Sequence, residues 1–149
     1  MAKFKYRMQN ILDVTEKLES QERANYSVAN AAVEEEQQKL QQLLVRRAGY
    51  EKQLKELSQG NLKLQEIQTT KAAIASMKEL IKNQMIAVRN AQRKLEIARK
   101  RLDDVMKDRK THENLKEKAF EEFKAELAQE ESKATDELVS YTYRMENDR

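Results

Sequence analysis

The side chains that could carry chemistry are few and far apart. His112 is the only histidine and the chain has no cysteine, so neither a Cys/His catalytic pair nor an ordinary zinc site can be assembled. Acidic runs at residues 34–36 and 121–122 offer carboxylates, but consecutive helix positions point about 100° apart and do not converge. Two isolated glycines cannot form a phosphate-binding loop. The sequence therefore predicts no catalytic residue, cofactor or metal site, and indicates a binding protein, not an enzyme.

The remaining candidate for a functional site is a basic segment that could bind the phosphates of a nucleic acid. Residues 82–107 carry eight basic and three acidic side chains, and residues 13–38 carry two basic and seven acidic ones. The two segments thus have net charges of +5 and −5, and complementary flanking charges orient antiparallel coiled coils. No aromatic residues are interleaved for base stacking. We therefore expect pairing within the chain and no nucleic-acid partner, and keep nucleic-acid binding as the alternative. The basic side chains concerned are Arg89, Arg93, Lys94, Arg99, Lys100 and Arg101.

Composition favours long helices around a thin apolar seam. Charged residues make up 37% of the chain, aromatic residues 5%, and proline is absent, which leaves few large side chains for a rounded core and no strong helix breaker. No run of 18 apolar residues occurs and the N-terminus does not resemble a signal peptide. We expect a cytoplasmic protein without direct membrane insertion.

Heptad spacing predicts two helices. The first, over about residues 4–57, begins in one frame and continues from Val33 in another, after a stutter of four residues. The turn falls at residues 58–61, where Gly60 can adopt a left-handed conformation and Asn61 can cap the next helix. The second helix, over about residues 62–145, follows one frame to Val105 and another from Phe120. The apolar positions in the first helix are Phe4, Met8, Ile11, Leu18 and Ala29, then Val33, Leu40, Leu43, Tyr50, Leu54 and Leu57. Those in the second are Ile67, Ile74, Met77, Ile81, Val88, Ala91, Leu95, Ala98, Leu102 and Val105, then Phe120, Phe123, Leu127, Ala134, Leu138, Tyr141 and Met145.

A bend near Gly60 makes facing residues sum to about 120. Apolar residues then meet apolar ones, and His112 falls opposite Met8. We predict an all-α fold, an antiparallel two-helix coiled-coil hairpin with a longer second helix, as a single domain over residues 1–149. The facing pairs are Leu43 with Met77, Leu40 with Leu80, Leu18 with Leu102, and Val14 with Met106.

The second helix is predicted to extend beyond the end of the first. With Phe4 opposite residue 116, about 30 C-terminal residues have no partner, an overhang of about 45 Å. The overhang keeps an apolar stripe, and each large side chain left in water costs about 1.5–3 kcal/mol. We therefore expect a partner to cover it.

Two segments resemble the FliJ family of flagellar export proteins. The N-terminal run, residues 4–14, reads FKYRMQNILDV, with alternating basic and aromatic residues before a hydrophobic residue, a glutamine and a leucine-rich helix start. Near the C-terminus, Glu131, Lys133, Asp136 and Glu137 are similar to the family's Glu-x-Lys-x-x-Asp ending. Length, heptads and the lack of cysteine agree across the whole chain.

The resemblance implies a stalk-like component of the flagellar type III export apparatus. Its implied partners are the export ATPase ring, the export gate membrane protein and flagellar export chaperones, at the cytoplasmic face of the cell membrane. The free chain is expected to be a monomer, and a homodimeric structural coiled coil is the alternative. The predicted partner-binding residues are Phe4, Tyr6, Met8, Ile11, Leu12, Phe120, Phe123, Leu127, Leu138 and Tyr141.

Overall fold

The computed structural model describes residues 3–60 and 63–147, which form two helices and no strand. Helix α1 spans Gln9–Gln59 and helix α2 spans Leu64–Asn147. The chain is 94% helical, and α1 and α2 make extensive contacts. This confirms the predicted all-α, antiparallel two-helix hairpin with a longer second helix.

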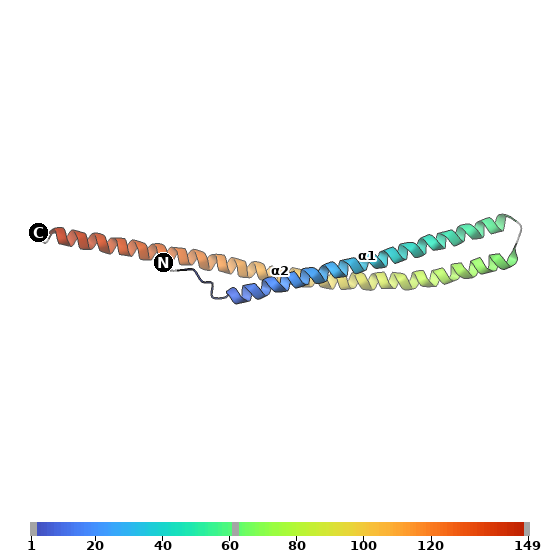
Figure 1. Cartoon of the computed structure of the whole chain (residues 1–149), viewed down its shortest axis with the longest axis horizontal. Helices are drawn as coiled ribbons and strands as arrows, with labels where there is room; N and C mark the ends of the chain where they lie inside the picture. The colour runs from blue at the N-terminus through green and yellow to red at the C-terminus, as the bar shows by residue number, and fades with distance from the viewer. Residues whose placement is uncertain (1–2, 61–62, 148–149) are drawn as a thin grey trace. The chain divides into compact units, whose positions relative to one another are not determined.

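The contacts divide the chain into two compact units. We call Ser20–Asp103 the hairpin unit, and the described residues up to Glu19 together with those from Asp104 onward the terminal unit. In the hairpin unit α1 and α2 run antiparallel on either side of the turn (Figure 1). Each unit is held by its own part of the seam between the helices.

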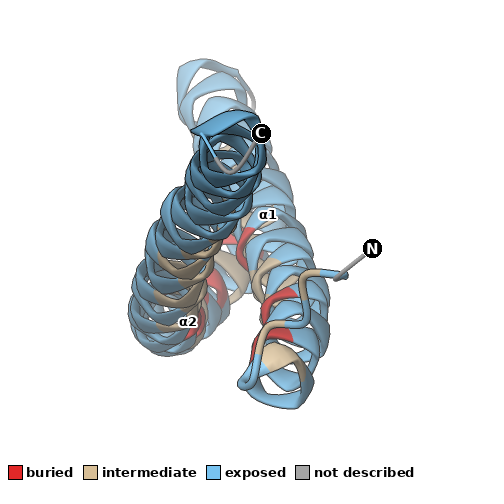
Figure 2. Cartoon of the chain, turned by 90° about the vertical axis from the view of Figure 1, so that its left-hand side faces the viewer, coloured by how far each residue is buried: buried red, intermediate tan, exposed pale blue. Residues whose placement is uncertain are grey.

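The seam of the hairpin unit is narrow. Its buried and half-buried residues recur three or four positions apart on each helix, and in Figure 2 the buried and intermediate stretches follow the facing sides of α1 and α2. No side chain among the described residues is less than 2% exposed, as expected where only one stripe of each helix can be covered. The buried set is Val33, Thr70, Met77, Ile81, Val88, Ala91 and Ala98.

A polar contact joins the two helices within this seam. The Gln84 side-chain amide donates to the Glu36 backbone carbonyl at 2.9 Å and to the Glu36 carboxylate at 2.5 Å. The two residue numbers sum to 120, as the predicted pairing requires. Lys39 lies 3.6 Å from the same carboxylate, so the charge of Glu36 is also offset on its own helix.

The ends of the helices differ from the prediction. Residues 3–6 are not helical, and α1 begins at Gln9, later than expected. The carbonyl of Met8 accepts hydrogen bonds from the amides of Ile11 and Leu12 at 3.1 Å. At the turn, Gly60 follows the last residue of α1 and has no positive φ, so the expected left-handed conformation there is wrong. Asn61, the expected cap, lies outside the described residues.

The predicted stutter in α1 is absent. Partly or fully buried residues follow one unbroken three–four spacing from Leu12 to Leu57, the frame that was predicted only from Val33 onward. The earlier frame is wrong because Met8, Ile11 and Leu18 are 39%, 45% and 44% exposed. The positions buried in their place include Thr15 and Glu19. Both are polar, so a search for regularly spaced apolar residues does not find them.

The predicted facing pairs are correct only in part. Met77 is buried and Leu43 is half-buried, as a pair within the seam should be. Val14, Leu18 and Leu80 are instead 55%, 44% and 46% exposed, so the pairs built on them are wrong. The apolar frame of α2 from Ile67 to Val105 is confirmed, and the same spacing continues to Phe123 without a change of frame.

Candidate functional site

An aromatic cluster lies at the start of the chain in the terminal unit. The Phe4 ring packs edge-on against Phe120, with centroids 5.1 Å apart, and against Phe123 at 5.5 Å. The ammonium of Lys124 lies 4.7 Å from the centre of the Phe120 ring. Phe120 and Phe123 were both predicted to be uncovered, and that is wrong for Phe123, which is half-buried, whereas Phe120 stays 37% exposed. The non-helical segment before α1 reaches them, because an extended chain covers more length per residue than a helix.

Charged residues fill the seam of this unit. The Glu19 carboxylate pairs with the guanidinium of Arg109, which also lies 2.9 Å from Glu113. The Arg109 side chain is 22% exposed and that of Glu19 is 9% exposed. Hydrogen bonds to Glu113 and then to Glu19 raise the pKa of Arg109, and burial opposes them. Arg109 therefore stays charged at any physiological pH, and the network holds α1 to α2 where apolar residues are missing.

A groove opens beside the aromatic cluster. Phe4, Leu12 and Phe120 form its apolar walls, and the cavity has a volume of about 460 Å³. Its rim carries three carboxylates and one ammonium group, from Glu16, Glu113, Glu117 and Lys116. The groove can accept an apolar side chain, and its rim favours a basic neighbour over an acidic one.

Beyond the cluster, the end of α2 has no cover from the rest of the described chain. Leu127 is the last half-buried residue, and residues 128–147 are all exposed, a helical length of about 30 Å. This is shorter than the predicted overhang because Phe4 reaches past residue 116. Large apolar side chains are nonetheless exposed there by 58–66%, namely Leu138, Val139, Tyr141, Tyr143 and Met145.

The ten predicted partner-binding residues fall into three groups. Leu12 is 3% exposed and belongs to the seam. Phe4, Tyr6, Phe123 and Leu127 are half-buried, and Phe120 is 37% exposed. The exposed ones are Met8, Ile11, Leu138 and Tyr141. Sequence reasoning missed Val139 and Tyr143, which are 64% and 65% exposed, because they lie on a different face of α2 from the predicted stripe.

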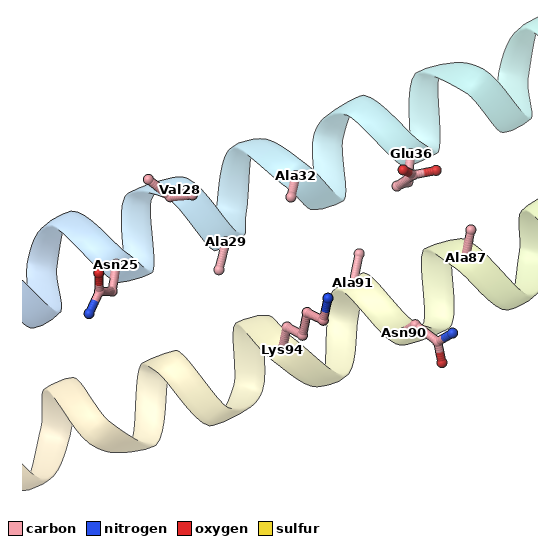
Figure 3. Close-up of a pocket in the computed structure, with 9 residues that line it drawn as sticks. All are labelled: Asn25, Val28, Ala29, Ala32, Glu36, Ala87, Asn90, Ala91 and Lys94. Carbon is pink, nitrogen blue, oxygen red and sulfur yellow. The ribbon is translucent and has the colours of Figure 1, made fainter.

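A second hollow, of about 570 Å³, lies in the hairpin unit. Ala29 and Ala32 on α1 point toward α2, and Ala87 and Ala91 on α2 point toward α1 (Figure 3). Four short side chains cannot fill the space between two helices. Asn25, Val28, Glu36, Asn90 and Lys94 complete its lining.

The described residues offer no site for metal chemistry. No group of three His, Asp or Glu side chains among them could hold a metal ion. His112 is half-buried, and its Nδ1 atom is buried with no hydrogen-bond partner in the described part of the chain. Across residues 3–60 and 63–147, neither helix has a segment apolar enough to cross a membrane.

Comparison with known families decides the identity. A family model described as "Flagellar FliJ protein" matches residues 4–148. The chain belongs to the FliJ family. It is therefore a component of the flagellar export apparatus, in a family of export-apparatus components. Neither the curated proteins nor the solved structures gave a match.

Proposed function

We propose that this FliJ-family chain is a non-enzymatic, stalk-like component that binds the ring of the flagellar export ATPase. It couples the ring to the export gate membrane protein and to substrate chaperones, at the cytoplasmic face of the membrane. The observation that carries the proposal is the uncovered end of α2, where Leu138 and Tyr141 are 66% and 61% exposed. An apolar face of this kind marks an interaction site.

The chemistry of this end suits a protein partner. Tyrosine, methionine and leucine give contact area, and buried aromatic anchors carry much of the energy of protein interfaces. Val139 and Tyr143 lie on another face from Leu138 and Tyr141, since residues three and four apart share a helix face but neighbours do not. A partner that surrounds the helix can contact both faces, and a flat partner can contact only one. The ring of an ATPase is a partner of the first kind.

The test compares two pairs of exposed residues. We expect Leu138→Ala with Tyr141→Ala to abolish stimulation of the ATPase, because truncating an anchor typically costs about 2 kcal/mol or more of binding energy. The matched control is Val45→Ala with Ile97→Ala, at side chains 61% and 53% exposed in the hairpin unit. Helical content and melting temperature should be unchanged in both, because none of the four side chains is in the seam. Undiminished stimulation by the first double variant would reject this end of α2 as the ATPase-binding surface.

The proposed free state is a monomer, and the alternative is a homodimer through the same surface. The mass of the chain in solution, measured over a wide range of concentrations, separates the two. A monomer keeps one mass throughout. A dimer that returns to monomer in the Leu138→Ala, Tyr141→Ala variant would assign this surface to a second copy of the chain.

A further inference from the structure

One flank of α2 in the hairpin unit carries a row of basic and apolar residues. Leu64, Lys71, Lys78 and Met85 are seven residues apart, and such residues lie in line along a helix, with a drift of about 20° per step. Lys82 lies one turn beyond Lys78 on the same side. Arg89 lies one turn beyond Met85. We call these six residues the basic flank.

The charges of the basic flank are not neutralised within the hairpin unit. All six residues are exposed, and within the described residues none of Lys71, Lys78, Lys82 and Arg89 forms an ion pair. Glu51, expected opposite this part of α2, is engaged by Arg47 on its own helix at 3.1 Å. The four positive charges are therefore available to an external anion.

Between residues 64 and 89 the positive charge lies on one side of α2. Over the same stretch, the row on the other flank of α2 has Glu66, Ala73, Leu80 and Ala87 at the same spacing and no positive charge, and its first basic member is Lys94, beyond the basic flank. Mixed surface charge would place lysines on both flanks. The asymmetry indicates a surface that meets a negatively charged partner from one direction.

The apolar members narrow the choice of partner. Leu64 is 68% exposed and Met85 is 57% exposed, and both stand in the same row as the lysines. Binding of nucleic-acid phosphates has no use for them, and the six residues include no aromatic ring for base stacking. An anionic bilayer uses both kinds of side chain. Lysine ammonium groups contact lipid phosphates while their stems and the neighbouring apolar groups enter the headgroup boundary.

We propose that the basic flank binds the surface of a membrane that contains anionic phospholipids. The contact is peripheral, with α2 lying along the headgroups and no segment crossing the bilayer. It concerns the hairpin unit and lipid alone, so it stands or falls separately from ATPase binding by the terminal unit. It gives the proposed membrane location a physical cause that does not depend on the export gate.

Vesicle sedimentation with the purified full chain tests the proposal. We expect binding to vesicles of phosphatidylcholine with phosphatidylglycerol, weak or no binding to phosphatidylcholine alone, and loss of binding in high salt. Lys71→Gln, Lys78→Gln and Lys82→Gln together should weaken binding about 100-fold, since each basic residue near an anionic surface contributes about fivefold. The control, Lys107→Gln, Lys110→Gln and Lys118→Gln, makes the same change of net charge at exposed sites in the terminal unit and should weaken binding much less. Equal loss in the two triple variants, or no binding to anionic vesicles, would overturn the proposal.

A second measurement separates lipid from other polyanions. The chain has no tryptophan, so Met85→Trp introduces a single reporter at an exposed site. Its emission should shift to the blue with anionic vesicles and stay unchanged with duplex DNA. The matched reporter Ile97→Trp, 53% exposed elsewhere on α2, should shift with neither. A blue shift at residue 97 equal to that at residue 85, or stronger binding to DNA than to vesicles, would contradict the assignment.

Discussion

Replacing Phe4 by alanine tests whether the segment before α1 is part of the fold or a loose end. Phe4 makes ring contacts at 5.1 Å and 5.5 Å to Phe120 and Phe123, and each such aromatic pair contributes about 0.5–1.5 kcal/mol beyond its buried area. Phe120 is still 37% exposed, so the lower part of this range applies. We expect Phe4→Ala to cost about 1–2 kcal/mol, which corresponds to a factor of about 5–30 in the docking equilibrium of the segment.

The loss should be local. Residues 3–6 are not helical and precede α1, so they can detach while the seam from Leu12 onward stays closed. Hydrogen exchange should therefore accelerate by the same factor at the amides of Gln9 and its neighbours, with little change in the hairpin unit. Phe4→Leu is the matched control, because it keeps an apolar side chain and loses only the ring–ring geometry.

The same variant can refute the reasoning. If exchange at Gln9 is unchanged in Phe4→Ala, then the cluster does not hold the segment. Comparison of Phe123→Ala with Tyr141→Ala gives an independent check, since Tyr141 is 61% exposed and its loss should leave the melting temperature within error. Equal effects of these two substitutions would mean that Phe123 is no better covered than the free end of α2.

Four further predictions concern the seam. Glu19→Ala should lower the melting temperature clearly more than Glu16→Ala, because Glu19 is 7% exposed and paired with Arg109 whereas Glu16 is exposed; equal effects would contradict a structural role for that pair. The pKa of Arg109 is raised in the folded chain, so its contribution to the free energy of unfolding is fully present below the ordinary arginine pKa. That contribution is lost only as pH rises through the still higher pKa of the folded state. The free energy of unfolding, measured between pH 6 and pH 9, should therefore show no step from this group. Gln84→Ala should cost about 1 kcal/mol through its lost bonds to Glu36, measured by urea denaturation against the exposed neighbour Asn83→Ala. Ala98→Leu should destabilise by about 1–3 kcal/mol through overpacking, because Ala98 is buried and does not line the hollow, while Ala72→Leu on the exposed side of α2 should be close to neutral.

The fold could be predicted because its main determinants are local. The absence of proline, the heptad spacing of α2 from Ile67 to Val105, and the break near Gly60 require no knowledge of tertiary contacts. The pairing rule also held at Glu36 and Gln84. What it could not give was the drift of pairing in the terminal unit, where Glu19 meets Arg109, whose numbers sum to 128.

The errors arose where polar residues occupy seam positions. Apolar spacing led the prediction to Ile11 and Leu18, while the structure buries Thr15 and Glu19. The Thr15 hydroxyl donates to the carbonyl of Ile11 at 2.8 Å, so the helix itself satisfies this polar group. A search for polar positions that continue a downstream heptad frame backwards from Val33 would have found both residues. The pairing of the charged segments at residues 13–38 and 82–107 stays a prediction, and Arg99 pairs with Glu96 on its own helix at 2.6 Å.

The contact between Gln84 and Glu36 opposes sliding of one helix along the other in the hairpin unit. A regular heptad seam is degenerate, because one helix can slip by seven residues along the other and still find apolar partners. A slip of that size would bring Gln84 beside Ala29 or Leu43, neither of which has a side chain that can accept its amide protons. The half-buried amide would lose its bond to the Glu36 carboxylate and keep only a backbone carbonyl as acceptor, which sets a local barrier against slippage in either direction. A force that pulls one helix along the other within the hairpin unit would then be resisted until it is large enough to break this one contact.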